Sequence, residues 1–143
     1  MKGWTQMLAA IRAVNEPEAV RSAIDAYFES WRTGDIDARA ALFADDASFA
    51  DPVGAPKFEG LEAIRGFWTA AAKAPIQTRP EVERVIVCGD EALVVFTMFL
   101  DAQGATVGSL QVHERFVFDS AGKIAELQPF WDVDSVNRHL PAS

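Results

Sequence analysis

Apolar residues recur at helical spacing in three stretches of the first half of the chain. The longest predicts a helix over residues 17–32, with Asn15 as its N-cap and Gly34 as its end. Shorter apolar stripes predict two more helices, over residues 37–43 and residues 61–73. We therefore expect three helices in this part of the chain, each with one apolar face available for packing.

The N-terminal residues form a separate short amphipathic stretch. Within residues 3–13, four large apolar side chains recur at helical spacing: Trp4, Met7, Leu8 and Ile11. We treat residues 1–14 as a helical extension of a single domain that spans residues 1–143. The expectation is that this extension packs back on the domain, with Trp4 in the core.

The apolar pattern changes from helical to alternating after Pro80. Four strands are expected between residues 81 and 131, joined by turns at Gly89-Asp90, Gln103-Gly104 and Ala121-Gly122. Helices followed by a meander of long strands indicate an α+β fold with a mainly antiparallel sheet. A strongly curved sheet of this kind can wrap its helices into a cone with an apolar interior.

The composition restricts the classes of function. The chain has 143 residues, half of them hydrophobic, which predicts one globular domain with a core and room for a small-ligand cavity. Its formal net charge of -8 argues against nucleic-acid and anionic-membrane binding, because both need clustered Lys and Arg. Cys88 is the single cysteine, and no spacing typical of structural zinc is present. The N-terminal stretch lacks a signal-peptide core, so the expected location is the cytoplasm.

Asp51 is the first candidate for chemistry. We expect a short strand to carry it and Pro52 to end that strand, so that the carboxylate lies at a rigid but accessible position. An Asp before Pro is by itself more often a turn residue. The nearby acids Asp35, Asp45 and Asp46 are expected to be solvated cap and turn residues. The role of Asp51 therefore depends on what lies near it in space.

Glu114 is the second candidate, because it lies in an apolar row. Alternation along the strand SLQVHERFVF puts it on the same face as Leu110, Val112, Phe116 and Phe118. If that face lines a cavity, burial raises the pKa of the carboxyl, and the neutral acid can donate a hydrogen bond. Alternatively, Glu114 pairs with an arginine. The strand pattern alone leaves both interpretations open.

Three segments resemble the bacterial ketosteroid isomerases of the cone-shaped NTF2-like and SnoaL-like superfamily. They are AYFESWRTGDIDARAALFADDASFADPVG, FTMFLDAQG and RFVFDSAGKIAELQPFW, and the match spans residues 26–132. Its most specific feature is a helix tyrosine, Tyr27, seven residues before a Gly-Asp pair. An Asp-Pro-Val-Gly turn and an acid on a late strand follow it. The resemblance implies the NTF2-like fold, with three helices packed on the curved sheet.

The resemblance also implies roles for single residues. Asp51 matches the family's general base, Tyr27 matches its oxyanion-hole tyrosine, and Glu114 falls where the family has a protonated aspartic acid. Six further residues are implied to contact the substrate: Val53, Phe67, Met98, Val112, Phe116 and Trp131. The implied reaction moves a C=C bond from the β,γ to the α,β position of a 3-oxo steroid. It needs no metal and no organic cofactor.

The acid of the late strand departs from the family pattern. Glutamic acid has one methylene more than aspartic acid, which moves the donated proton by about 1 to 1.5 Å. Counting forward from the Gln103-Gly104 turn brings His113 to this position instead, whereas the parity of the apolar row favours Glu114.

The surroundings of the tyrosine are a second departure. Phe43 and Trp68 stand where some relatives have further tyrosines, so Tyr27 is expected to lack a supporting chain of phenols. Its hydroxyl should then keep a more ordinary acidity.

Two other classes of function remain open. One is a polyketide cyclase or dehydratase of the same superfamily, which a histidine facing the cavity with Asp51 would favour. The other is a non-catalytic module that binds small ligands, which a structural salt bridge at Asp51 would favour.

The sheet also predicts an assembly. One row of side chains is expected on its uncovered face: Val94, Thr97, Phe99, Gln111, His113 and Val117. This row is more apolar than a monomer usually leaves exposed, so a symmetric homodimer through the sheet is expected.

Overall fold

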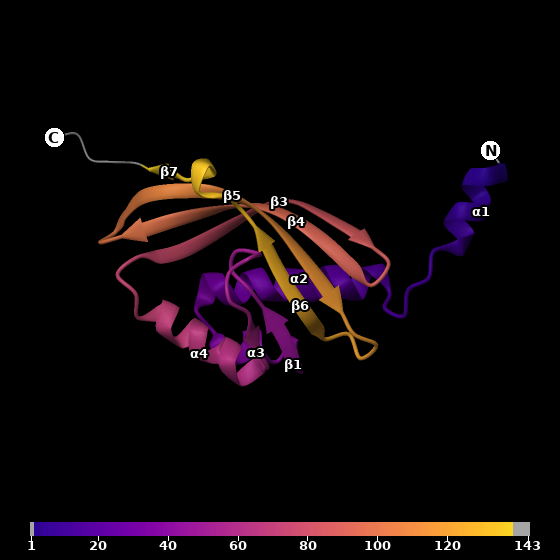
Figure 1. Ribbon diagram of the computed structural model, residues 1–143, viewed down its shortest axis with the longest axis horizontal. Helices are drawn as coiled ribbons and strands as arrows, with labels where there is room; N and C mark the ends of the chain where they lie inside the picture. The colour runs from indigo at the N-terminus through magenta and orange to yellow at the C-terminus, as the bar shows by residue number, and fades with distance from the viewer. Residues whose placement is uncertain (1, 139–143) are drawn as a thin grey trace.

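A single curved sheet forms the framework of the protein, and the helices between residues 17 and 72 lie on one of its two faces (Figure 1). The computed structural model describes residues 2–138. Its helices are α1 (Lys2–Ala10), α2 (Pro17–Thr33), α3 (Ile36–Ala40) and α4 (Leu61–Ala72), with a short 3₁₀ helix at Val133–Ser135. Its strands are β1 (Phe43–Phe49), β2 (Phe58–Glu59), β3 (Gln77–Cys88), β4 (Glu91–Ala102), β5 (Ala105–Phe118), β6 (Ile124–Phe130) and β7 (Asn137–Arg138).

The long strands form the predicted meander. Along the sheet the order is β2-β1-β6-β5-β4-β3, and β7 pairs with β5. Only the pair of β1 with β6 is parallel among these strands. The turn before β5 places both Gln103 and Gly104 at positive φ, as a tight hairpin requires. The expected α+β fold on a mainly antiparallel sheet is confirmed.

Helix α2 begins at Pro17, as predicted, but its N-cap lies one residue later than predicted. Glu16 occupies the N-cap position, and Pro17 supplies the first turn. The side chain of Asn15 instead donates hydrogen bonds to Asp90 and to the Asp119 carbonyl. At the other end Gly34 adopts the left-handed conformation of a C-cap, as predicted.

The segment around Phe43 differs from its prediction. Helix α3 ends at Ala40, and Phe43 begins a strand, because its side chain packs inward while its backbone pairs with Ile124 of β6. Asp45 and Asp46 are solvent-exposed, as expected, but they lie within β1 and not in a turn. Asp51 follows β1 by two residues, in a bend and not in the strand itself.

Helix α1 does not pack on the domain, which corrects the prediction for the N-terminal extension. It extends away from the sheet and the other helices (Figure 1). Its apolar side chains stay exposed, and Trp4 is 59% exposed instead of buried. The last contact before α2 is at the connection, where Asp90 accepts hydrogen bonds from the backbone N–H groups of Val14 and Asn15, and α1 lies beyond this anchor.

The uncovered face of the sheet is partly apolar, and one of the six residues predicted there lies elsewhere. Val94 pairs with Glu114 across the strands and is fully buried on the inner face, so its assignment to the outer face was wrong. The other five have the parity opposite to the cavity-lining positions, as predicted: Thr97, Phe99, Gln111, His113 and Val117. The outer face also carries Leu93, 36% exposed, and Phe130, 48% exposed. No helix among residues 2–138 combines the length and apolar character needed to cross a membrane.

Candidate active site

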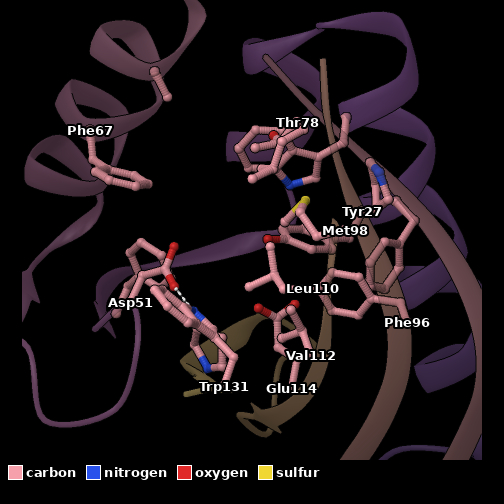
Figure 2. A pocket seen from close by; sticks show the side chains of 17 residues that line it. Tyr27, Asp51, Phe67, Thr78, Phe96, Met98, Leu110, Val112, Glu114 and Trp131 are labelled. Atoms are coloured by element: carbon pink, nitrogen blue, oxygen red, sulfur yellow. Dashed lines mark hydrogen bonds between the residues drawn. The ribbon is translucent and has the colours of Figure 1, made fainter. Parts of the chain in front are cut away.

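The open side of the cone holds a cavity of about 250 Å³ between the helices and the inner face of the sheet. Most of its lining is apolar. Three ionisable side chains from distant parts of the chain reach it: Tyr27 from α2, Asp51 from the bend after β1 and Glu114 from β5. Figure 2 shows these three groups around the same space. The structure thus brings together the three residues that the sequence singled out for catalysis.

Tyr27 is held by aromatic packing. It is 4% exposed, and its ring packs edge-on against Phe28 and Phe116, with centroids 5.1 and 5.2 Å away. Burial raises the pKa of Tyr27 well above its ordinary value of 10.0, and the Glu114 carboxyl raises it further. The expectation of an ordinary acidity was therefore wrong, because desolvation outweighs the missing chain of phenols.

Glu114 is a buried carboxyl that has no ionic partner within residues 2–138. It is 4% exposed, and its Oε1 atom has no hydrogen-bond partner among the described residues. The neighbouring Arg115 faces the other side of the sheet, where it pairs with Glu91. Burial raises the pKa of Glu114 well above its ordinary value, and the negative charge of Asp51 adds to this effect. Of the two interpretations left open, the neutral acid agrees with the structure and the arginine pair does not.

The register of β5 is also decided. Glu114 faces the cavity, whereas His113 is exposed on the opposite face of the sheet. Counting forward from the Gln103-Gly104 turn is wrong by one residue because β5 has one residue more than β4 near the hairpin. The pairing of the two strands shifts there, between Leu100 and Asp101. His113 therefore does not replace Glu114 in the cavity.

Asp51 differs from Glu114 in its surroundings. It lies at the solvent-accessible side of the cavity, and its Oδ1 accepts a hydrogen bond of 2.8 Å from Nε1 of Trp131. Partial burial raises the pKa of Asp51, whereas the Trp131 hydrogen bond lowers it by favouring the ionised form. Among the described residues Asp51 forms no ion pair. One cavity thus holds a buried carboxyl and an accessible one.

Four of the six predicted contact residues line the cavity, namely Phe67, Met98, Val112 and Trp131. The other two do not. Phe116 is fully buried behind Tyr27, because its position on β5 lies deeper in the core. Val53 follows the bend and binds the Pro129 carbonyl through its backbone N–H, which leaves its side chain in a separate shallow hollow.

Other lining residues were missed by the sequence analysis. Trp31 lies one helical turn after Tyr27, and its position could have been read from the spacing of four. Phe96 and Leu110 share the parity of Met98 and Val112, so strand alternation could have identified them. Thr78 comes from the start of β3, where the sequence predicted no strand.

The arrangement suits proton transfer. An accessible carboxylate can accept a proton, while a buried neutral acid and a phenol can donate hydrogen bonds to one developing charge in an apolar space. Among residues 2–138 no three His, Cys, Asp or Glu side chains gather as they would around a metal ion.

Known proteins share both the sequence pattern and the fold. Residues 24–127 match the SnoaL-like domain. A steroid Δ-isomerase from Nocardioides simplex is 34% identical over 112 residues, which cover 78% of this chain and 89% of that enzyme.

Two solved structures show the likeness of fold at lower identity. One is SalBIII, an epoxide hydrolase/cyclase-like enzyme with a role in pyran ring formation in the polyether salinomycin. Its TM-score is 0.76, and its sequence is 21% identical over 87% of this chain and 98% of the other. The second is a Mycobacterium tuberculosis protein in complex with estradiol-17β-hemisuccinate, with a TM-score of 0.73 and 19% identity over 83% of this chain and 98% of the other. The chain therefore belongs to the SnoaL-like (NTF2-like) family and is a relative of the Nocardioides simplex steroid Δ-isomerase.

Proposed function

We propose that this protein is a steroid Δ-isomerase that moves a C=C bond from the β,γ to the α,β position of a 3-oxo steroid. One observation carries the proposal. The buried Oε1 of Glu114, which has no partner among the described residues, lies in the same apolar cavity as Tyr27 and Asp51. The relationship to the Nocardioides simplex enzyme supports the choice of substrate class.

Asp51 acts as the base. The reaction removes the acidic proton between the carbonyl and the double bond, holds a dienolate, and returns the proton two carbons away. One carboxylate can make both transfers when it is ionised and reaches both carbons. The Trp131 hydrogen bond favours the ionised form of Asp51, and the open side of the cavity leaves the carboxylate accessible.

Tyr27 and neutral Glu114 hold the oxyanion. Burial raises the pKa of each group well above its ordinary value, which favours the neutral, hydrogen-bond-donating form of both. Neutral donors in a water-poor site stabilise a developing negative charge without reorganisation of solvent. The extra methylene of Glu114, compared with the family's aspartic acid, displaces its donor by about 1 to 1.5 Å. The ketosteroid isomerases are the established example of this division between an ionised and a neutral carboxyl.

The cavity lining supports the proposed substrate class, and the outer face of the sheet supports a proposed assembly. The apolar lining suits a hydrophobic steroid-like molecule, and the Mycobacterium tuberculosis structure of similar fold holds an estradiol derivative. We further propose a homodimer through the outer face of the sheet, since Leu93 and Phe130 stay exposed there.

The alternative functions lack the features that would favour them. Among the described residues no histidine lines the cavity, so the pattern expected of a dehydratase is missing there. Asp51 accepts a hydrogen bond from Trp131 and forms no ion pair within residues 2–138, unlike the structural salt bridge expected of a simple binding module.

The decisive experiment uses 5-androstene-3,17-dione, whose conjugated product is followed by its enone absorbance. Asp51→Asn keeps the shape and removes the base, so turnover should fall by several orders of magnitude. General acid–base participation alone contributes about 10² to 10⁴ in rate. Binding of the phenolic steroid equilenin and the melting temperature should be retained.

Asp46→Asn is the matched control, because Asp46 is an exposed acid on β1 away from the cavity lining. Its turnover should equal that of wild type. The proposal is wrong if Asp51→Asn isomerises the steroid at the wild-type rate, or if wild type neither converts the dione nor binds equilenin.

A further inference from the structure

Arg39 is a buried cation that the proposed mechanism leaves without a role. It lies on α3 and is 2% exposed. None of the ion pairs within residues 2–138 includes it. Burying a charge without an opposite charge is costly, so such a group needs compensation from its surroundings.

Two tryptophans and a serine supply that compensation. The guanidinium Cζ lies 3.5 Å from the ring centroid of Trp31 and 4.9 Å from that of Trp68. A planar guanidinium stacks on aromatic faces in this way, which a lysine ammonium cannot reproduce. Nε of Arg39 donates to Ser30 Oγ, and Nη2 donates to the Ser30 carbonyl, both at 3.1 Å.

Both contacts lead to Tyr27. The ring of Trp31 packs edge-on against Tyr27, with centroids 6.4 Å apart, and Trp31 itself lines the cavity. Ser30 donates its hydroxyl proton to the carbonyl oxygen of Tyr27. Arg39 does not line the cavity, and it contacts Trp31 and Ser30, two residues of α2 that in turn contact Tyr27.

The position of Arg39 matters because charged groups near Tyr27 shift the pKa of its phenol. Glu114 and Asp51 both raise the pKa of the phenol, whereas Arg39 is the cation that lowers it, together with the Trp31 side chain. Asp35 is the further acid whose field reaches Arg39, and its carboxylate caps α3 through the Ala38 N–H. Phe43, which packs beside Tyr27, carries no hydroxyl that could act in place of a cation.

We propose that Arg39 is a positioning residue for the oxyanion hole: stacked on Trp31 and Trp68, it orients Tyr27 through Trp31 and Ser30 and supplies positive charge near Tyr27. This inference rests on the proposed isomerase function for its effect on turnover. Its effect on Tyr27 itself does not depend on turnover.

The chain makes the effect on Tyr27 directly measurable, because Tyr27 is its single tyrosine. Biosynthetic replacement of tyrosine by a fluorotyrosine of lowered pKa gives one ¹⁹F resonance, which reports the ionisation of this residue alone. Circular dichroism at each pH restricts the titration to folded protein. The series compares wild type with Arg39→Met and Arg39→Gln, which remove the charge, and with Arg39→Lys, which keeps it.

Arg32→Met is the matched control. Arg32 is also a cation of the α2–α3 region, but it is exposed and paired with Glu29. We expect both neutral variants of Arg39 to raise the pKa of fluorotyrosine 27, while Arg39→Lys raises it less and Arg32→Met leaves it unchanged. In the steroid assay the neutral variants should lower kcat about tenfold with little change in KM, as loss of stabilisation restricted to the transition state requires.

An unchanged pKa in a folded neutral variant overturns the proposal. So does a pKa that rises equally in Arg32→Met, since that would reflect net charge and not the position of Arg39. If Arg39→Met does not fold, Arg39→Gln decides, because its amide can still bond Ser30. Absence of isomerase activity in wild type would refute the proposed function, while the ¹⁹F titration would still test the link between Arg39 and Tyr27.

Discussion

The indole nitrogen of Trp131 donates a hydrogen bond of 2.8 Å to Oδ1 of Asp51. Trp131 therefore both lines the cavity and holds the accessible carboxylate of Asp51. Trp131 follows β6 directly, and Asp51 follows β1, the parallel neighbour of β6. Parallel strands end at the same edge of a sheet, which brings these two residues together although 80 positions separate them.

Replacement of Trp131 should change the pH dependence of turnover. Trp131→Phe removes the hydrogen bond that favours ionised Asp51, so the pKa of Asp51 should rise further above its ordinary value. The acid limb of the kcat/KM profile should then move to higher pH. Trp4→Phe, which alters an exposed tryptophan on α1, is the control. Identical acid limbs in wild type and Trp131→Phe would contradict a role of the hydrogen bond in setting this pKa.

Two substitutions of Glu114 should separate donation from packing. Glu114→Gln keeps a hydrogen-bond donor and a similar volume, whereas Glu114→Ala removes the donor and leaves a cavity. Gln should retain far more steroid turnover than Ala. A thermal melt of each variant accompanies the assay. Equal turnover of the two folded variants would show that Glu114 does not donate to the reacting oxygen.

Glu114 should also make stability depend on pH. Its pKa in the folded protein is well above the value of 4.5 expected in the unfolded chain, so the folded state holds a proton that the unfolded state releases. Its contribution is complete below pH 4.5 and is lost as the pH rises toward the folded pKa.

Glu114→Gln carries no such proton. The melting temperature of wild type should therefore fall relative to Glu114→Gln as the pH rises above 4.5. Melts of both proteins from pH 4 to pH 8 measure the difference. A constant difference in melting temperature between the two proteins across this range would mean that Glu114 has the same pKa in the folded and unfolded states.

The outer face of the sheet should mediate a dimer. Light scattering of wild type at micromolar concentration is expected to give twice the mass of one chain. Leu93→Glu places a charge on this face and should yield monomers, because burying an unpaired carboxylate at an interface is unfavourable. Val53→Glu, at an exposed position of the bend after Asp51, should remain dimeric. A monomeric mass for wild type would remove the assembly proposal.

Local patterns were sufficient for most of the fold, whereas the three central residues were singled out only with the help of the family resemblance. Helical spacing identified α2 and α4, and alternation identified the four long strands, because both periods follow from backbone geometry alone. The same alternation assigned Glu114 to the inner face. Strand alternation could also have assigned Val94 to the inner face, where it lies beside Glu114, but Val94 was predicted on the outer face.

Periodicity along the chain was thus enough to predict the order of the elements and the direction in which strand residues point. Contacts between distant segments settled three other points: α1 extends away from the domain, Glu114 has no arginine partner within residues 2–138, and Arg39 stacks on the cavity-lining Trp31. Each of these depends on groups far apart in the chain. Packing partners, desolvation and the resulting pKa shifts arise when the sheet and helices close around the cavity, and no local pattern encodes them.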